Sequence, residues 1–179
     1  MTIEHKAFVF DCDGFNNELS DVLKNAILTH KSDNLIAFIE RNLSCLKDPY
    51  EGETLDFSWK ELIEAGDINE YGDFAITKYY DPKSDIGIGY GWEKINDALL
   101  QELNLDISPL LGRPFGSAEN YFDPGKLGSY FQSLEQVKEN FKLLDSLSEE
   151  QLKTLPNIAI VEKMLSDALA LEKGLYITF

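Results

Sequence analysis

The feature that most constrains the fold is where the strand-forming segments lie along the chain. Residues 5–10 and 175–179 are rich in apolar, β-branched and aromatic side chains, and they stand at opposite ends of a chain of 179 residues. Residues 74–80 and 86–88 have the same character, and the turn-forming stretch 81–84 separates them, so they predict a central hairpin. Because a terminal strand must pair to satisfy its backbone, we expect a small sheet that brings both chain ends and this hairpin together.

Most of the remaining chain has the 3.6-residue apolar spacing of amphipathic helices. This spacing is present in residues 19–27, 35–46, 92–103 and 134–144. The predicted helix ends are capping boxes that begin at Ser58, Ser133 and Ser148, a helix start at Pro156, and helix stops at Gly66 and Gly174. The fold class is therefore α+β: a mainly helical single domain of residues 1–179, with a small, largely antiparallel sheet formed by the N-terminal strand, the central hairpin and the C-terminal strand.

Composition argues against several classes of function. The chain has 32 acidic and 16 basic side chains, and its formal net charge of −16 repels nucleic-acid phosphates and anionic lipid heads. Neither nucleic acid nor a membrane is therefore an expected partner. No apolar run reaches the roughly 20 residues of a membrane helix, and no secretory signal is recognisable, so we expect a cytoplasmic protein. The sequence leaves the oligomeric state open.

No cofactor and no metal are predicted. Cys12 and Cys45 are too few and too far apart for a disulfide framework or a zinc site, and we interpret them as reduced, buried thiols. Neither His5 nor His30 has a neighbour at a spacing typical of a catalytic triad or a metal site. The glycines of Gly87–Trp92 lack the third glycine of a dinucleotide-binding loop, so they predict tight-turn geometry.

The strongest functional signal is a concentration of acidic residues between Asp48 and Asp73. Nine acidic side chains stand there against one basic side chain, Lys60. The aromatic residues among them are Tyr50, Phe57, Trp59 and Tyr71. Aromatic anchors inside a charged patch are typical of protein interfaces, so this region is predicted to bind a basic protein partner. The residues expected to contact the partner are Asp56, Trp59, Glu61, Glu64, Asp67 and Glu70, together with Arg113 from the loop 108–128.

Two simpler interpretations of these residues stay open. The acidic segment also fits a solvated face that only keeps the protein in solution. Arg113 also fits structural pairing with an internal carboxylate, which is common where acids are plentiful. In bulk composition the chain is similar to small acidic immunity proteins that act against bacterial nuclease toxins. This resemblance implies a non-catalytic, immunity- or inhibitor-like domain that holds and neutralises a basic protein.

The end of the first strand suggests an alternative class of function. An apolar strand that ends in Asp11-Cys12-Asp13-Gly14 resembles the first motif of haloacid-dehalogenase-type phosphatases. The resemblance implies a magnesium-dependent phosphohydrolase in which Asp11 is the nucleophile and Asp13 the general acid and base, both helping to hold the metal. The simpler interpretation is an Asp–Gly turn at a strand end. We place binding first, because the acidic segment involves many residues and the phosphatase interpretation rests on one short motif.

Overall fold

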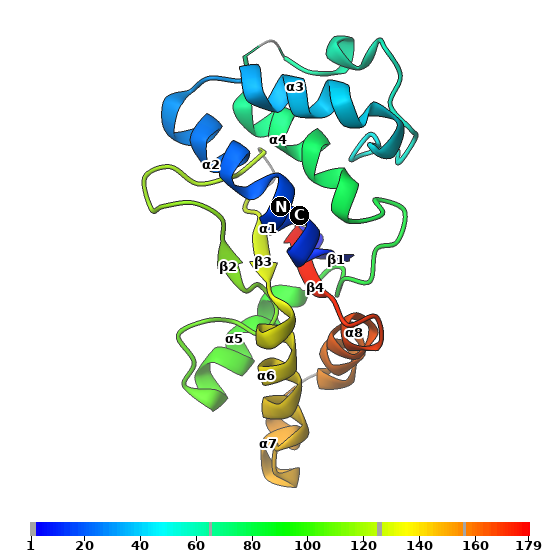
Figure 1. The fold of residues 1–179 in the computed structure, drawn as a ribbon. Coiled ribbons are helices and arrows are strands. Elements are labelled where there is room, and N and C mark those ends of the chain that lie inside the picture. The colour runs from blue at the N-terminus through cyan, green and yellow to red at the C-terminus, as the bar shows by residue number, and fades with distance from the viewer. Residues whose placement is uncertain (1–2, 65, 125–126, 156) are drawn as a thin grey trace. The chain divides into compact units, whose positions relative to one another are not determined.

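The computed structural model describes residues 3–64, 66–124, 127–155 and 157–179. Within these residues the chain forms two compact units (Figure 1). The first unit contains the chain up to Phe10, Ile86–Arg113 and Tyr130–Phe179. The second unit contains Asp11–Asp85 and Pro114–Ser129. The chain therefore leaves the first unit after its first strand and returns to it twice.

The first unit is built on an antiparallel sheet. Its strands are β1 (Lys6–Phe10), β2 (Arg113–Pro114), β3 (Tyr130–Gln132) and β4 (Gly174–Thr178), and their order across the sheet is β1-β4-β3-β2. The C-terminal strand β4 lies between β1 and β3, with Phe10 opposite Gly174 and Tyr130 opposite Ile177. Every residue of β4 is buried. The prediction that the two ends of the chain pair in one small antiparallel sheet is confirmed.

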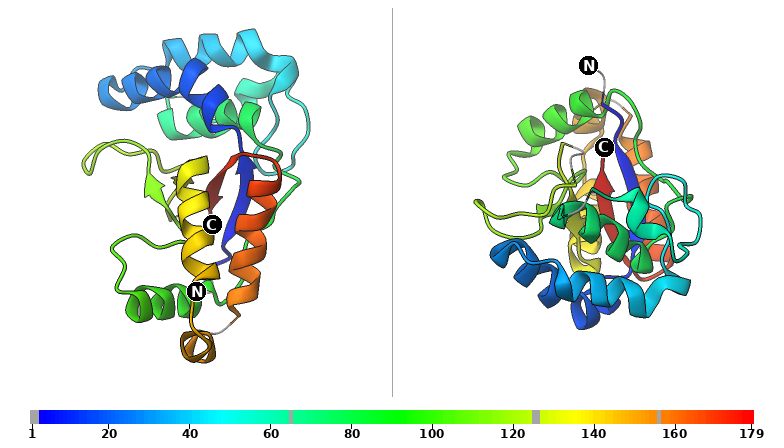
Figure 2. Two further views of the ribbon diagram at one scale, coloured as in Figure 1. Left: turned by 60° about the horizontal axis from the view of Figure 1, so that its bottom comes forward. Right: turned by 90° about the horizontal axis from the view of Figure 1, so that it is seen from above.

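Four helices accompany this sheet in the first unit. They are α5 (Trp92–Leu103), α6 (Leu134–Asp145), α7 (Glu149–Thr154) and α8 (Ile158–Ala170). Helices α6 and α8 pack on the sheet, and Figure 2 shows them side by side in front of β1 and β4. Their buried residues, among them Val137, Leu144 and Leu165, form one core cluster with Leu175 and Ile177 of β4. The capping boxes predicted at the starts of α6 and α7 are both formed.

The second unit is helical. Its α-helices are α1 (Cys12–Glu18), α2 (Ser20–Thr29), α3 (Asp33–Asn42) and α4 (Ile68–Ile76), and its 3-10 turns are η1 (Leu43–Cys45), η2 (Trp59–Leu62) and η3 (Thr77–Tyr79). Helix α4 packs against α2 and α3 (Figure 1). Its residues Tyr71–Ile76 are all buried, and Leu23 and Leu35 are fully buried on the neighbouring helices. The α4 helix is therefore the centre of this unit.

The predicted central hairpin is wrong. Residues 74–79 belong to α4 and η3, and Tyr80 follows them. A short apolar run of this kind does not distinguish a buried helix from a buried strand by its periodicity. Residues 86–89 do run beside β1, where His5 and Gly89 exchange backbone hydrogen bonds of 3.1 and 3.0 Å. A Cβ atom on Gly87 would lie 2.3 Å from the backbone oxygen of His5, so glycine permits this close approach. The strand that pairs with β4 on the side away from β1 is β3, and not a strand of the predicted hairpin.

Several predicted helix ends are also corrected. Ser58 makes no capping hydrogen bond to η2, and this turn ends at Leu62, so Gly66 does not close it. Gly174 is the first residue of β4, because α8 already ends at Ala170. The helix start predicted at Pro156 lies outside the described residues.

The two cysteines are less buried than predicted. The prediction of a buried thiol is wrong for Cys45, which is exposed at the end of η1, while Cys12 is half-buried.

His5 is buried and structural: its Nδ1 accepts a 3.2 Å hydrogen bond from the backbone of Ile88, and its Nε2 lies 3.0 Å from the carbonyl of Leu110. No helix formed by the described residues is long and apolar enough to cross a membrane.

Candidate partner-binding surface

The acidic segment begins with a tightly hydrogen-bonded loop at residues 46–55. Leu55 donates a backbone hydrogen bond of 3.0 Å to Leu46, and Asp48 donates one of 2.8 Å to Glu53. The Asp48 carboxylate accepts backbone hydrogen bonds from Tyr50 and Glu51 at 2.7 and 2.9 Å, as turn-forming aspartates do. We call these residues the 46–55 loop. Its own backbone bonds define its shape.

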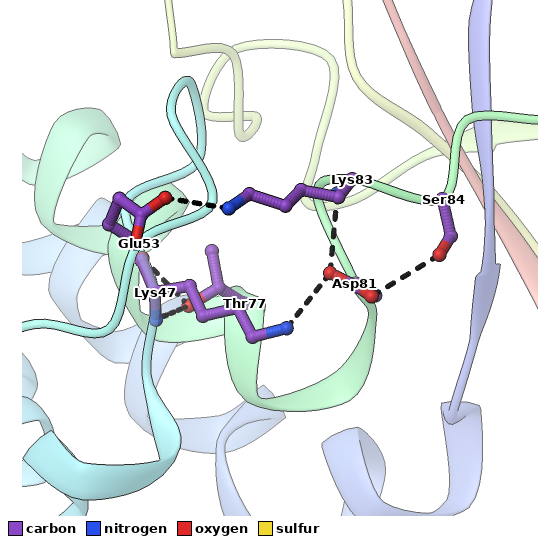
Figure 3. A network of polar contacts seen from close by, with 6 residues as sticks. All are labelled: Lys47, Glu53, Thr77, Asp81, Lys83 and Ser84. Atoms are coloured by element: carbon purple, nitrogen blue, oxygen red, sulfur yellow. Dashed lines mark hydrogen bonds and ion pairs between the residues drawn. The ribbon is translucent and has the colours of Figure 1, made fainter.

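Polar contacts hold the 46–55 loop against the end of α4 and the turn that follows it (Figure 3). The Lys47 ammonium lies 2.8 Å from Asp81, and the Lys83 ammonium lies 2.6 Å from Glu53. The Thr77 hydroxyl donates to the Lys47 carbonyl at 3.1 Å and accepts from the Lys47 backbone N–H at 3.0 Å. These contacts connect segments about thirty residues apart in the sequence and place the loop in one position.

The same contacts change the acid–base properties of their members. The hydrogen bond from Lys47 lowers the pKa of Asp81, and the hydrogen bond from Lys83 lowers the pKa of Glu53. The bond to Glu53 raises the pKa of Lys83 in turn. Lysines therefore offset the negative charges of Glu53 and Asp81.

Trp59 anchors the next part of the segment. It is only 3% exposed, and its ring meets that of Tyr71 edge-on at 6.0 Å. The Lys60 ammonium lies 5.6 Å from the Trp59 ring centroid and forms an ion pair of 2.7 Å with Glu40 on α3. Trp59 is therefore a core residue of the second unit, so the sequence-based expectation that its ring meets a partner is not supported. It fixes the backbone of η2 instead.

The residues around Trp59 face solvent. Phe57 is 97% exposed and Leu62 is 57% exposed, although both are large and apolar. Asp56, Glu61 and Glu64 are exposed as well. We call residues 56–64 the acidic turn, because three exposed carboxylates and two exposed apolar side chains share it. Aromatic side chains such as that of Phe57 are enriched among the contact residues of protein interfaces.

Two other predicted contact residues, Asp67 and Glu70, have structural roles in the second unit. The half-buried Asp67 caps α4, accepting hydrogen bonds from the backbones of Asn69 at 2.8 Å and Glu70 at 3.2 Å. The Glu70 carboxylate accepts a bond of 2.7 Å from the backbone of Glu64, which holds the end of the acidic turn. The predicted set thus divides into exposed residues (Asp56, Glu61, Glu64) and supporting residues (Trp59, Asp67, Glu70).

Tyr50 and Asp73 lie in the acidic segment, and Arg113 lies outside it. Tyr50 is exposed, and its pKa rises to about 12 because of partial burial and the negative charges of Asp73 and Glu70. Its hydroxyl therefore stays protonated and can donate a hydrogen bond. Asp73 is buried within α4. Arg113 is exposed in β2 of the first unit and forms no ion pair with the residues that the structure describes.

The sequence does not reveal that Phe57 and Leu62 are exposed while Trp59 is buried. Phe57 was one of four aromatic residues in the segment, and no pattern distinguished it from Trp59. The residues on either side of Phe57 form a turn. The Asp56 carboxylate accepts hydrogen bonds from the Ser58 hydroxyl at 2.6 Å and the Ser58 backbone at 2.8 Å, and these bonds lower the pKa of Asp56. Phe57 lies at the centre of this Asp-x-Ser turn, and turns of this kind usually lie on the protein surface.

The aspartates of the alternative hypothesis lie at the start of α1. Asp11 is the N-cap of this helix and accepts a bond of 3.2 Å from the backbone of Gly14, while Asp13 is exposed in the first turn. The strand before them, β1, pairs antiparallel with β4. Among the described residues, no group of three or more His, Cys, Asp or Glu side chains is placed to hold a metal ion. The phosphohydrolase hypothesis stays a prediction.

A second carboxylate network lies near this helix. Glu18 accepts hydrogen bonds from the ammonium of Lys78 and, at 3.1 Å, from the hydroxyl of Tyr79. Both bonds lower the pKa of Glu18, the Lys78 bond more. Burial, followed by the bond to Glu18, raises the pKa of Tyr79. This network joins α1 to η3, so Glu18, Lys78 and Tyr79 have a structural role.

Comparison of this chain with protein-family models, with curated proteins and with solved structures finds no match.

Proposed function

We propose that this protein is a non-catalytic, immunity- or inhibitor-like binding domain that holds a basic protein through the acidic turn. The observation that carries the proposal is the pairing of Phe57 and Leu62, exposed and apolar, with three exposed carboxylates on a backbone anchored by Trp59. Apolar anchors surrounded by charge are the usual centres of protein interfaces.

Preorganisation supports this proposal. Trp59 fixes η2 from inside, and Glu70 holds the end of the acidic turn through the Glu64 backbone. A surface that is already ordered loses less conformational entropy on binding, so more of its contact energy appears as affinity. The exposed carboxylates then increase the association rate with a basic partner through long-range attraction. We expect the partner to present lysine or arginine side chains around an apolar depression.

The experiment is affinity capture from lysate of the source organism, followed by measurement of the dissociation constant with the isolated partner. The binding variants are Phe57→Ser and the triple variant Asp56→Asn, Glu61→Gln, Glu64→Gln. The matched control triple is Asp97→Asn, Glu102→Gln, Glu139→Gln, which removes the same charge from exposed helix positions in the first unit.

We expect Phe57→Ser and the acidic-turn triple variant each to weaken binding by about ten-fold or more, and the control triple to change it far less. Salt should weaken the wild-type complex more than the acidic-turn variant, because screening acts on the carboxylates that the variant lacks. Equal losses in the two triple variants would show that net charge alone attracts the partner. An unchanged dissociation constant in Phe57→Ser would remove the acidic turn from the interface.

A further inference from the structure

The second unit contains a cavity that the acidic turn does not use. Its volume is about 180 Å³. The residues that line it are Lys24, Ile27 and Leu28 from α2, and Gly116, Ser117 and Asn120 from the loop after β2. The three α2 residues share one face because they are spaced by three and four positions. A cavity of about 150 Å³ with apolar walls accommodates a benzene ring, so this one has room for a small aromatic or aliphatic group.

The loop side of the cavity is a tight hairpin at residues 115–122. Phe122 donates a backbone hydrogen bond of 2.8 Å to Phe115, and Ser117 donates one of 2.8 Å to Asn120. The Ser117 hydroxyl also accepts a bond of 3.1 Å from the Asn120 backbone. Gly116 has a φ of +112°, and a Cβ atom there would lie 2.4 Å from the Asn120 carbonyl, so the hairpin needs glycine at this position. This wall has a defined shape.

Buried aromatic rings hold the hairpin in place. Phe122 is fully buried, and a Cβ atom added to Gly72 of α4 would lie 2.7 Å from its ring. Phe115 meets the buried ring of Phe15 edge-on at 5.2 Å. The opposite wall, α2, is held by its fully buried Leu23. Buried core residues therefore support each wall, although Lys24, Leu28, Gly116 and Ser117 of the lining are themselves exposed.

One cation stands among the lining residues. The Lys24 ammonium lies 5.4 Å from the centroid of the Phe115 ring, a cation–π distance, and forms no ion pair with the described residues. Lys24 therefore contributes an ammonium group to the lining of the cavity. Beside it, Leu28 is 62% exposed, so part of the apolar wall faces water. The lining thus combines an ammonium group with apolar side chains.

We propose that this cavity binds a small carboxylate with an apolar body, such as an aryl or short alkyl acid. The apolar body lies against Ile27 and Leu28 and removes their surface from water. The carboxylate lies at the Lys24 ammonium and supplies a counter-charge. The site is independent of the partner surface proposed above, so the failure of one does not affect the other.

The test is a titration of the ¹⁵N-labelled full chain followed by heteronuclear NMR, with phenylacetate as the probe and phenylacetamide as its uncharged isostere. We expect saturable shifts centred on the backbone of residues 24–28 and 116–120. Lys24→Gln should weaken phenylacetate up to about five-fold, as loss of an exposed ion pair does, and leave phenylacetamide unchanged. The control Lys31→Gln removes an exposed lysine that does not line the cavity and should bind like the wild type.

A second variant tests the apolar wall. Leu28→Asp places a carboxylate in the wall at an exposed position, so it should fold, as circular dichroism would verify, and lose the phenylacetate shifts. Three results would overturn the proposal: no saturable shift at millimolar phenylacetate, equal affinity in Lys24→Gln and the wild type, or shifts at these residues caused by protein concentration alone. The last result would assign the cavity to a second copy of the chain.

Discussion

Phe57 and Trp59 are two positions apart and have opposite environments. Phe57 is 97% exposed and Trp59 is 3% exposed. The difference arises because Trp59 meets Tyr71 of α4, whereas Phe57 lies in the surface turn between Asp56 and Ser58. The two rings therefore contribute to different properties of the protein, and mutagenesis can separate these.

Truncation of the two rings should affect stability very differently. Trp59→Ala should lower the free energy of unfolding by about 3–5 kcal/mol, because it leaves a cavity in the second unit. Phe57→Ala should change it by less than about 0.5 kcal/mol, because the side chain is already in water. Urea denaturation followed by circular dichroism measures both. A large loss in Phe57→Ala would mean that its ring is packed in solution.

Glu18 predicts a pH dependence at the residue scale. Its pKa is lowered in the folded state by hydrogen bonds from Lys78 and Tyr79, so its contribution is present above its ordinary value of 4.5 and is lost as the pH falls through the lowered pKa. Glu18→Gln should therefore reduce stability near neutral pH, and the difference from the wild type should disappear in acid. Because the side chain is 47% exposed, we expect no more than about 1 kcal/mol.

Thermal unfolding of Glu18→Gln and the wild type across the acidic range measures this effect. Glu102→Gln is the control, because Glu102 is exposed in α5 and accepts no side-chain hydrogen bond from the described residues. A constant difference between Glu18→Gln and the wild type down to the lowest pH would contradict a role for the ionised carboxylate.

At the scale of elements, helix α4 organises the second unit, and its start depends on Asp67. Asp67→Ala should destabilise the protein by about 1 kcal/mol, whereas Asp67→Asn should cost much less, because asparagine caps a helix as well as aspartate does. Urea denaturation of both variants measures the cap. If Asp67→Asn were as unstable as Asp67→Ala, the charge and not the cap would be the stabilising feature.

Gly72→Ala is a second test of α4, because helix propensity and packing predict opposite changes in stability. Helix propensity alone predicts that Gly72→Ala stabilises the helix by about 1 kcal/mol. The structure predicts the opposite, because the new Cβ atom would lie 2.7 Å from the Phe122 ring and 2.9 Å from Leu23. We expect a loss of about 1–3 kcal/mol from overpacking, measured by urea denaturation. A stabilised variant would contradict the packing of the 115–122 hairpin on α4.

At the scale of the whole molecule, the net charge of −16 should limit stability at low ionic strength. Salt screens repulsion among exposed carboxylates over about 10 Å or less. Raising sodium chloride from about 0.02 to about 0.5 M should therefore raise the melting temperature by about 2–4 °C, which corresponds to roughly 1 kcal/mol in a chain of this size. Calorimetry measures the shift, and a lower melting temperature at high salt would show that attractive ion pairs dominate.

The sequence by itself determined those features that depend on neighbouring residues. The two terminal strands, the helices α5 and α6, and the capping boxes at Ser133 and Ser148 follow from local spacing and local hydrogen bonds. These interactions span only a few residues, so a sequence pattern records them directly. The acidic character of residues 48–73 is likewise a property of composition.

Only the tertiary structure decided the features that depend on distant partners. Residues 74–80 are apolar enough for either a helix or a strand, and packing of α4 against α2 and α3 selects the helix. The buried Trp59 ring contacts Tyr71, and the 46–55 loop contacts Asp81 and Lys83, which lie far along the chain. The cavity likewise needs the 115–122 hairpin beside α2. Exposure and cavities arise from contacts between segments far apart in the chain, and no local periodicity encodes them.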